Sequence, residues 1–210
     1  MGVREFWSLP FHLNEHTLDP RPESELIVEA VLKWVGPRTK DPWHILDCGT
    51  GTGCLLIALL HELKKATGLG IDINEGALTM AQHNAELNGV APRSQFQNSN
   101  WGDELTEKFD IIVTNPPYIP LKDKETLERC VLNYDPEKAL FGGENGLECY
   151  QRLAQNLPPL LSAGGVVVVE IGQGQKKEVS QLFERAAFQL LFCLKDLAGI
   201  ERTLAFSQKD

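Results

Sequence analysis

The sequence predicts an α/β fold built on a seven-stranded, mostly parallel sheet with helices on both faces. Short apolar stretches alternate with helical segments through most of the 210 residues, and this alternation is typical of a parallel sheet. A glycine-rich stretch, residues 49–53, joins the first of these strands to a helix, as in nucleotide-binding α/β folds. No helix separates the last two strands, so we expect an antiparallel hairpin at the edge of the sheet.

Residues 1–23 are predicted to form an arm, as a β-hairpin and linker, ahead of a main domain of residues 24–210. Ser24 is expected to cap the first helix of that domain, and Gly36-Pro37 to end it. The expected strands cover residues 44–48, 69–73, 95–97, 109–113, 166–170, 190–194 and 203–206. The expected helices after the glycine-rich stretch cover residues 54–63, 77–87, 147–161 and 176–187. Residues 120–146 form a long polar connection, a length typical of functional lids or substrate platforms.

Composition narrows the classes of protein that fit. The hydrophobic content of 42% supports a real core, yet no apolar run approaches the length that crosses a bilayer. The five cysteines form no C-x-x-C pair, so we expect reduced, mostly buried thiols, no metal and a cytoplasmic protein. The net charge of −9 argues weakly against a nucleic-acid partner, because binding of nucleic acid depends on neutralising phosphates.

The glycine-rich stretch predicts a nucleotide-like ligand. Its glycines allow a tight turn and a close backbone approach to a ligand at the start of a helix. Asp72 lies about 20 residues beyond Gly53, the spacing expected of an acid that binds ribose hydroxyls. No Gly-Lys-Ser or Gly-Lys-Thr follows, so this is not a nucleoside-triphosphate loop, while a dehydrogenase remains open on these features alone.

Residues Thr114 to Tyr118 read Thr-Asn-Pro-Pro-Tyr and directly follow an apolar strand. Neither proline has a backbone N–H, and a residue before proline is held extended, so the segment is rigid. It offers carbonyl groups, the amide of Asn115 and an aromatic ring, which together suit a planar substrate with an N–H₂ group. A simple proline-rich turn is the alternative interpretation.

Taken together, these motifs resemble those of a known group of enzymes. Asp47-x-Gly49-x-Gly51-x-Gly53, Asp72 and Asn-Pro-Pro-Tyr are similar to the S-adenosylmethionine-dependent class I methyltransferases, whose fold is Rossmann-like. More narrowly, the chain resembles the HemK/PrmC family, the protein-(glutamine) methyltransferases that modify peptide-chain release factors. The supporting stretches are Arg4-Glu5-Phe6-Trp7, Thr17-Leu18-x-Pro20-Arg21-Pro22-Glu23, Gly142-Gly143-x-x-Gly146-Leu147, Glu170-Ile171-Gly172-Gln173 and Lys195-Asp196-Leu197-x-Gly199. The Asn-Pro-Pro-Tyr motif alone also fits amino-methyltransferases of DNA or RNA bases, which stay open as the alternative.

The resemblance implies methyl transfer to the side-chain nitrogen, N(5), of the glutamine in the Gly-Gly-Gln motif of a release factor. The implied cofactor-binding residues are Gly49, Thr50, Gly51, Thr52, Gly53, Asp72, Trp101 and Asn115. The implied catalytic residues are Asn115, Pro116 and Tyr118, and the implied substrate-binding residues are Asn115, Pro116, Pro117 and Tyr118. Trp101 would cover the adenine, with a core tryptophan as the alternative, and Tyr118 would pack on the substrate amide, with a loop anchor as the alternative.

Two departures from the family pattern accompany this resemblance. The helical domain that usually precedes the arm is missing from this sequence, which bears on how a large protein substrate docks. Asn100 stands before Trp101 where the family often has an acid, so an amide contact to the adenine edge is expected there. Arg21 and Glu23 are candidates for closing the site from the arm, or a solvated pair at the start of a helix. A monomer is expected.

Overall fold

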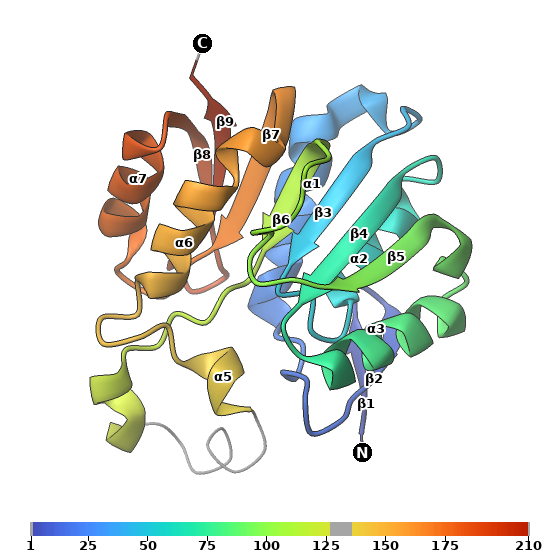
Figure 1. Ribbon diagram of the computed structural model, residues 1–210, viewed down its shortest axis with the longest axis horizontal. Helices are drawn as coiled ribbons and strands as arrows, with labels where there is room; N and C mark the ends of the chain where they lie inside the picture. Colours follow the sequence, from blue (N-terminus) through green and yellow to red (C-terminus); the bar gives the residue numbers. More distant parts are fainter. Residues whose placement is uncertain (1, 127–135, 210) are drawn as a thin grey trace.

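In the computed structural model, which describes residues 2–126 and 136–209, seven strands form one mixed sheet (Figure 1). The strands of this sheet are β3 (His44–Cys48), β4 (Thr67–Asp72), β5 (Ser94–Asn98), β6 (Phe109–Thr114), β7 (Leu161–Glu170), β8 (Phe188–Lys195) and β9 (Glu201–Gln208). Their order is β5-β4-β3-β6-β7-β9-β8, with β9 antiparallel to both of its neighbours and all other pairs parallel. The predicted fold class and its C-terminal edge hairpin are confirmed.

Helices cover both faces of this sheet (Figure 1). In the described part of the chain the α-helices are α1 (Glu25–Val35), α2 (Cys54–Glu62), α3 (Glu75–Leu87), α5 (Glu137–Leu140), α6 (Glu148–Asn156) and α7 (Lys176–Arg185). Short 3-10 turns are η1 (Pro22–Ser24), η2 (Gly36–Arg38), η3 (Ala91–Arg93), η4 (Leu121–Thr126) and η5 (Pro158–Leu160). Helices α1 and α2 pack in one layer with part of α3, and α6 and α7 form the other.

The strands are apolar on both faces because helices cover both sides of the sheet, and neighbouring residues of a strand point to opposite layers. Ile45 packs in the α1–α2 layer, while the next residue, Leu46, packs in the α6–α7 layer. Val166 and Val167 divide in the same way. Continuous apolar runs in the sequence therefore correspond to strands that are buried on both sides.

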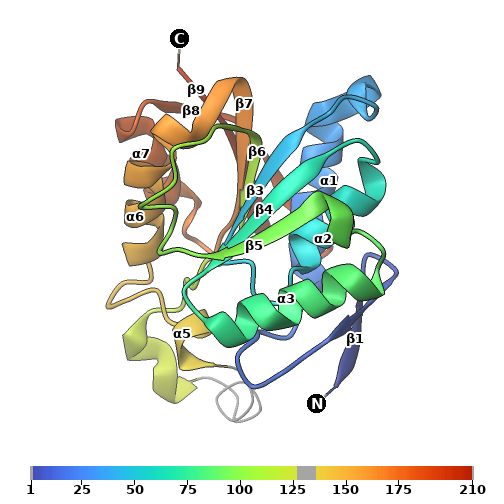
Figure 2. The same cartoon turned by 45° about the vertical axis from the view of Figure 1, so that its right-hand side comes forward.

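The arm begins with an antiparallel hairpin of β1 (Val3–Phe6) and β2 (Leu9–His12). Strand β2 packs along α3 (Figure 1), and β1 lies at the margin of the molecule (Figure 2). The buried Asn84 of α3 holds it there, accepting a hydrogen bond from the His12 N–H at 2.9 Å and donating one to the His12 carbonyl at 3.1 Å. The hairpin is thus fixed to the helix that follows β4.

Three details differ from the sequence-based expectations. The helix expected over residues 147–161 ends at Asn156, because Pro158 and Pro159 lack the N–H groups that would continue it. Ser24 makes no side-chain cap of α1, and its hydroxyl binds elsewhere. Of the four cysteines that the structure describes, only Cys48 is fully buried, although all four are free thiols; Cys130 lies outside the described residues.

The polar connection over residues 120–146 contains η4 and α5 in its described part. Its two ends are joined, because Ile119 pairs with Phe141 and the Leu121 N–H donates to the Gly143 carbonyl at 3.0 Å. Residues 127–135 lie outside the described part of the chain. The connection therefore returns to the carboxyl end of β6, close to the segment that starts at Asn115.

Candidate functional site

The carboxyl ends of β3, β4 and β6 meet at one edge of the sheet. Cys48 pairs with Ile71 on one side and with Thr114 on the other, and the Thr114 hydroxyl donates to the Cys48 carbonyl at 2.8 Å. The residues that follow these strands are therefore neighbours. In open α/β sheets, ligands bind at this position, where the strand order reverses.

Two adjoining cavities lie at this edge. The first is lined by the glycine turn, Asp72 to Asn74, Ser99, Trp101 and residues of the arm. The second is lined by Pro116, Tyr118, Glu170 and Arg202, with Glu23 from the arm. The residues that line both cavities are Leu18, Arg21, Asn115, Pro117 and Ala139. The structure thus brings together every residue of the sequence-predicted site except Gly53, which lines neither cavity in the described part of the chain.

The glycine turn is held against the end of β4. The N–H groups of Gly49 and Thr50 both donate to the Ile71 carbonyl, at 2.8 and 2.9 Å. Gly53 has a φ of +80° and caps α2, and a Cβ there would lie 3.2 Å from the Cβ of Ala81. Gly53 therefore serves the turn and the packing of α2 on α3.

Asp47 is a fully buried acid beneath this turn. The Thr50 hydroxyl donates to its Oδ2 at 2.6 Å, while its Oδ1 has no hydrogen-bond partner among the described residues. Burial raises the pKa of the Asp47 carboxyl to about 7, although the Thr50 hydrogen bond acts in the opposite direction. The Thr50 side chain is thereby committed to Asp47 as well as lining the first cavity.

Asp72 binds both the glycine turn and the segment before α3, which line the first cavity. Its Oδ2 accepts the Gly51 N–H at 3.1 Å, and its Oδ1 accepts the Asn74 N–H at 3.0 Å. Burial raises the pKa of Asp72, opposed by these backbone hydrogen bonds. A carboxylate oxygen can accept more than one hydrogen bond, so Asp72 retains capacity for ligand hydroxyls.

Ser99 is a cavity residue that the sequence reasoning missed. It follows β5, its N–H donates to the Asp72 carbonyl at 3.1 Å, and its Oγ is buried with no partner among the described residues. Asn100, which was expected to reach the ligand, is exposed and is not part of the cavity lining that the structure describes. The signal in the sequence was positional, since Ser99 is the residue directly after a strand.

Trp101 is half-buried and closes the same side. Its backbone φ is +55°, and its carbonyl accepts a hydrogen bond from Asn156 Nδ2 at 3.1 Å. Its ring lies against the glycine turn, because a Cβ on Gly49 would be 3.3 Å from the indole. Trp101 also packs against the core cluster of the α6–α7 layer, so it is both a core residue and a cavity wall.

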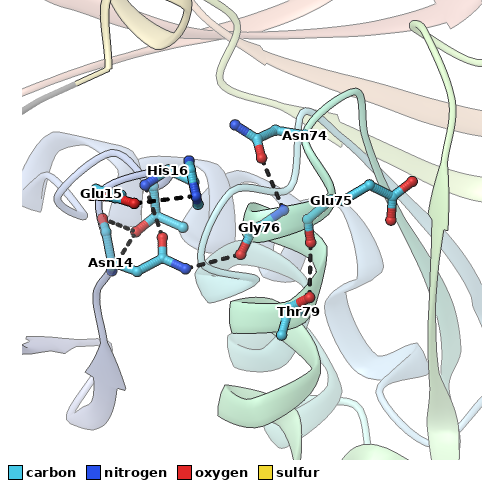
Figure 3. Close-up of polar contacts among 8 residues, drawn as sticks. Asn14, Glu15, His16, Asn74, Glu75, Gly76 and Thr79 are labelled. Carbon is cyan, nitrogen blue, oxygen red and sulfur yellow. Dashed lines mark hydrogen bonds and ion pairs between the residues drawn. The ribbon is translucent and has the colours of Figure 1, made fainter.

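The arm supplies the remaining wall of the first cavity. Asn14 Nδ2 donates to the Gly76 carbonyl at 2.9 Å, and Asn14 Oδ1 accepts the His16 N–H at 2.9 Å (Figure 3). Asn74 caps α3 by accepting the Gly76 N–H at 2.9 Å. These bonds place His16, which the sequence reasoning did not single out, at the start of α3 and at the cavity edge.

Asn115 stands between the two cavities and is held by a buried chain of polar groups. Its Nδ2 donates to Ser24 Oγ at 2.8 Å, and Ser24 Oγ donates to Glu170 Oε2 at 2.6 Å. The Tyr118 hydroxyl lies 3.5 Å from Glu170 Oε1, a long hydrogen bond. Burial raises the pKa of Glu170 to about 7, partly offset by the Ser24 hydrogen bond and by Arg202.

The rigid loop after Asn115 rests on the glycines of residues 142–146 and on Gln175, which lies just beyond the Glu170-Ile171-Gly172-Gln173 stretch. Gln175 Nε2 donates to the carbonyls of Tyr118 and Gly146, at 3.1 and 3.2 Å. A side chain on Gly142 would collide with the Pro117 carbonyl, and one on Gly146 with the Tyr118 carbonyl. These glycines therefore allow the backbone to approach closely at both positions. Burial also raises the pKa of the Tyr118 hydroxyl.

Among the residues that the structure describes, no group of three or more His, Cys, Asp or Glu side chains is arranged to hold a metal ion. In the same part of the chain, none of the helices combines the length and the apolar character needed to cross a membrane.

Comparison with known proteins identifies the family. The family described as "Methyltransferase domain" matches residues 39–187. A release factor glutamine methyltransferase of Rhodospirillum rubrum is 45% identical, over 97% of this chain and 62% of that protein. One from Agrobacterium fabrum is 42% identical, over 98% of this chain and 72% of that protein. A ribosomal protein L11 methylase of Lactobacillus delbrueckii subsp. bulgaricus has the same fold, with a TM-score of 0.68 and 24% identity over 90% of this chain and 81% of that one.

The first cavity fits the cofactor S-adenosylmethionine. Its floor is a glycine turn, where side chains would fill the space, and its rim carries the carboxylate of Asp72. The Ser99 hydroxyl, which has no partner among the described residues, offers a further hydrogen bond, and the Trp101 ring offers an apolar wall. The chain carries an S-adenosylmethionine-dependent methyltransferase domain. It belongs to the release factor glutamine methyltransferase family.

Proposed function

We propose that this chain methylates the side-chain amide nitrogen, N(5), of the glutamine in the Gly-Gly-Gln motif of a peptide-chain release factor. The relatives' names support the substrate, and the second cavity supports the chemistry. We also propose that residues 1–23 act as an arm on a methyltransferase domain of residues 24–210. The protein is proposed to work as a monomer in the cytoplasm.

The position of Asn115 carries this proposal. Asn115 and Pro117 line both cavities, so a planar group in the second cavity faces the first across them. The Asn115 Nδ2 donates to Ser24, which directs the NH₂ group toward Ser24 and leaves Oδ1 as the acceptor atom of this side chain. No described residue donates a hydrogen bond to this oxygen or to the Pro116 carbonyl. Both atoms are therefore available to accept from a substrate N–H₂ group.

The chemistry of an amide nitrogen explains why acceptors are needed. Its lone pair is delocalised into its own carbonyl, so it is a poor nucleophile. When bound, S-adenosylmethionine supplies an electrophilic methyl group on a sulfonium and leaves as S-adenosylhomocysteine. Asn115 Oδ1 and the Pro116 carbonyl would hold the two N–H bonds, aim the nitrogen and stabilise the positive charge that grows on it. As the new C–N bond forms, the bond between the methyl group and the sulfur would break, and one proton would pass from the nitrogen to water.

Tyr118 and the walls of the second cavity complete the substrate site. Tyr118 is the aromatic lining residue, and its backbone is fixed by Gln175. We propose that its ring packs on the planar amide, which restricts the rotation of the glutamine side chain. Arg21 lines both cavities and Glu23 lines the second, which supports a role for the arm in closing the site.

A labelling experiment tests the substrate. The chain is incubated with S-adenosylmethionine carrying a labelled methyl group, with a release factor, with a release factor whose motif is changed to Gly-Gly-Glu, and with RNA and DNA. Label on the release factor at the motif glutamine, absent from the Gly-Gly-Glu protein, supports the proposal. Label on a nucleic acid in place of the release factor favours the base amino-methyltransferase alternative and overturns it.

A further inference from the structure

We propose that Ser24 and Glu170 are positioning residues that orient the Asn115 side-chain amide for methyl transfer. Neither residue belongs to the Asn-Pro-Pro-Tyr motif, and they come from opposite ends of the chain. Ser24 ends η1 beside the arm, while Glu170 ends β7. This inference rests on the proposed function and adds to it the residues that set the direction of one hydrogen-bond acceptor.

The direction of each hydrogen bond from Asn115 through Ser24 to Glu170 follows from the chemistry of the three groups. An ionised carboxylate only accepts hydrogen bonds, so the Ser24 hydroxyl must donate its proton to Glu170 Oε2, 2.6 Å away. The oxygen of Ser24 can then only accept from Asn115, 2.8 Å away. Asn115 must present its NH₂ to Ser24, and its Oδ1 is left for the substrate. The charge on Glu170 thus selects one of the two amide orientations.

Burial makes this selection effective. Ser24 is 3% exposed and Glu170 is 1% exposed, so water does not compete readily for either group. The second oxygen of Glu170 faces the Tyr118 hydroxyl, and the backbone carbonyl of Glu170 accepts from the Tyr150 hydroxyl at 3.0 Å. The two carboxylate oxygens therefore contact Ser24 and Tyr118, and the Tyr150 hydrogen bond fixes the backbone of Glu170.

A neutral group at position 170 removes the selection. A protonated carboxyl or a glutamine can donate to Ser24 Oγ, which frees the Ser24 proton to bind Asn115 Oδ1 and turn the amide round. Burial raises the pKa of Glu170 to about 7. The charged or titratable groups that act on it are Arg202 from β9, Glu23 from η1, Tyr118 after β6, Tyr150 from α6 and Cys54 from α2. The orientation should accordingly depend on pH near neutrality.

The variants are Glu170→Gln, Ser24→Ala and Ser24→Thr, with Thr203→Val as the matched control. Thr203 pairs directly with Glu170 across β7 and β9, and its buried hydroxyl has no partner among the described residues. Glu170→Gln and Ser24→Ala are expected to lower kcat on the release factor by on the order of 10- to 100-fold, the scale of a misplaced reacting group. Cofactor affinity should stay within about threefold, less than the contribution of one hydrogen bond. Ser24→Thr keeps the hydroxyl and should restore kcat, and Thr203→Val should match the native chain.

The pH dependence separates positioning from a purely structural role. In the native chain, kcat should rise as pH increases through the pKa of Glu170, because the ionised form orients Asn115. In Glu170→Gln this rise of kcat with pH should disappear, and kcat should be low at every pH measured. Native kcat in Glu170→Gln, or an unchanged rise of kcat with pH, overturns the inference while leaving the proposed function standing.

A second measurement does not depend on turnover. The side-chain NH₂ resonances of Asn115, assigned by their loss in Asn115→Asp, are followed by NMR from one pH unit below to one unit above the pKa of Glu170. They should shift in the native chain and in Thr203→Val, and stay constant in Glu170→Gln. Constant resonances in the native chain overturn the inference even if the release factor proves not to be the substrate.

Discussion

Ser24 Oγ and Asn115 Nδ2 are joined by a 2.8 Å hydrogen bond, although 91 residues separate them in the sequence. Ser24 lies where the arm meets α1, and Asn115 follows the central strand β6. The bond therefore connects the segment that walls the cofactor cavity with the loop proposed to hold the substrate.

Asn115→Ala should abolish turnover while sparing cofactor binding. The substitution removes the proposed acceptor of the substrate N–H, and we expect kcat to fall by on the order of 100-fold or more. Cofactor affinity, measured by calorimetry, should change little, because Asp72 and the glycine turn remain. Gln189→Ala is a suitable control, since that amide binds Ser207 on the exposed edge hairpin. Undiminished methyl transfer by Asn115→Ala would exclude the proposed role.

Asp72→Ala should weaken cofactor binding. It removes the carboxylate at the cavity rim and leaves the Gly51 and Asn74 N–H groups without their acceptor. We expect affinity to fall by on the order of 10- to 100-fold, the effect of losing hydrogen bonds to a charged group. Asp110→Ala is the matched control, because Asp110 accepts the His44 N–H at the opposite ends of the strands. Equal affinities for the two variants, by calorimetry, would contradict the ribose assignment.

Asn84→Ala should release the arm. Asn84 also donates to the Thr52 carbonyl at 2.9 Å, so one buried amide ties β2 and the glycine turn to α3. Unpaired buried backbone groups cost about 1 to 3 kcal/mol each, so the free energy of unfolding should fall by that order. Limited proteolysis should cut the arm faster, and cofactor affinity should decline because arm residues line the cavity. Asn88→Ala, which removes a more exposed bond to the Pro10 carbonyl, should have a smaller effect on each measurement.

Asp47 should make the cofactor-free chain less stable as pH rises. Its pKa is raised by burial from 3.8 to about 7, so between these values the folded chain binds more protons than the unfolded chain. The contribution is fully present below about pH 4 and is lost as pH rises through 7, at up to about 1.4 kcal/mol per unit. Glu170 has the same sign, so Asp47→Asn should reduce the slope without removing it. Thermal unfolding of the native chain and of Asp47→Asn, measured between about pH 4 and pH 7, tests this prediction. If stability falls equally steeply with pH in both proteins, the shifted pKa of Asp47 is contradicted.

Much of the fold could be predicted from the sequence because its signals are local. Val166 to Val169 form a continuous apolar run, which indicates a strand buried on both faces wherever it is placed. Gly49 and Gly51 adopt positive φ values in a turn that their sequence already indicated. The end of α6 is also indicated locally, by Pro158 and Pro159. The helix predicted over residues 147–161 was too long because it did not take these two prolines into account.

Ser24 and Ser99 show where local reasoning fails. Ser24 has the sequence context of a helix cap, yet its hydroxyl binds Glu170, 146 residues away. Ser99 lines the cavity instead of Asn100 because the chain leaving β5 turns one side chain inward and the next outward. A hydroxyl binds whichever partner is near it, and the identity of that partner depends on strand order.

The sequence by itself determined the alternation of strands and helices, the glycine turn and the rigid Asn-Pro-Pro-Tyr segment, because periodicity, positive φ and proline geometry act over a few residues. Only the tertiary structure decided that the arm walls the cofactor cavity and that Asn115 is linked through Ser24 to Glu170. Those contacts join segments from both ends of the chain, and they form only when the sheet places the carboxyl ends of its strands side by side.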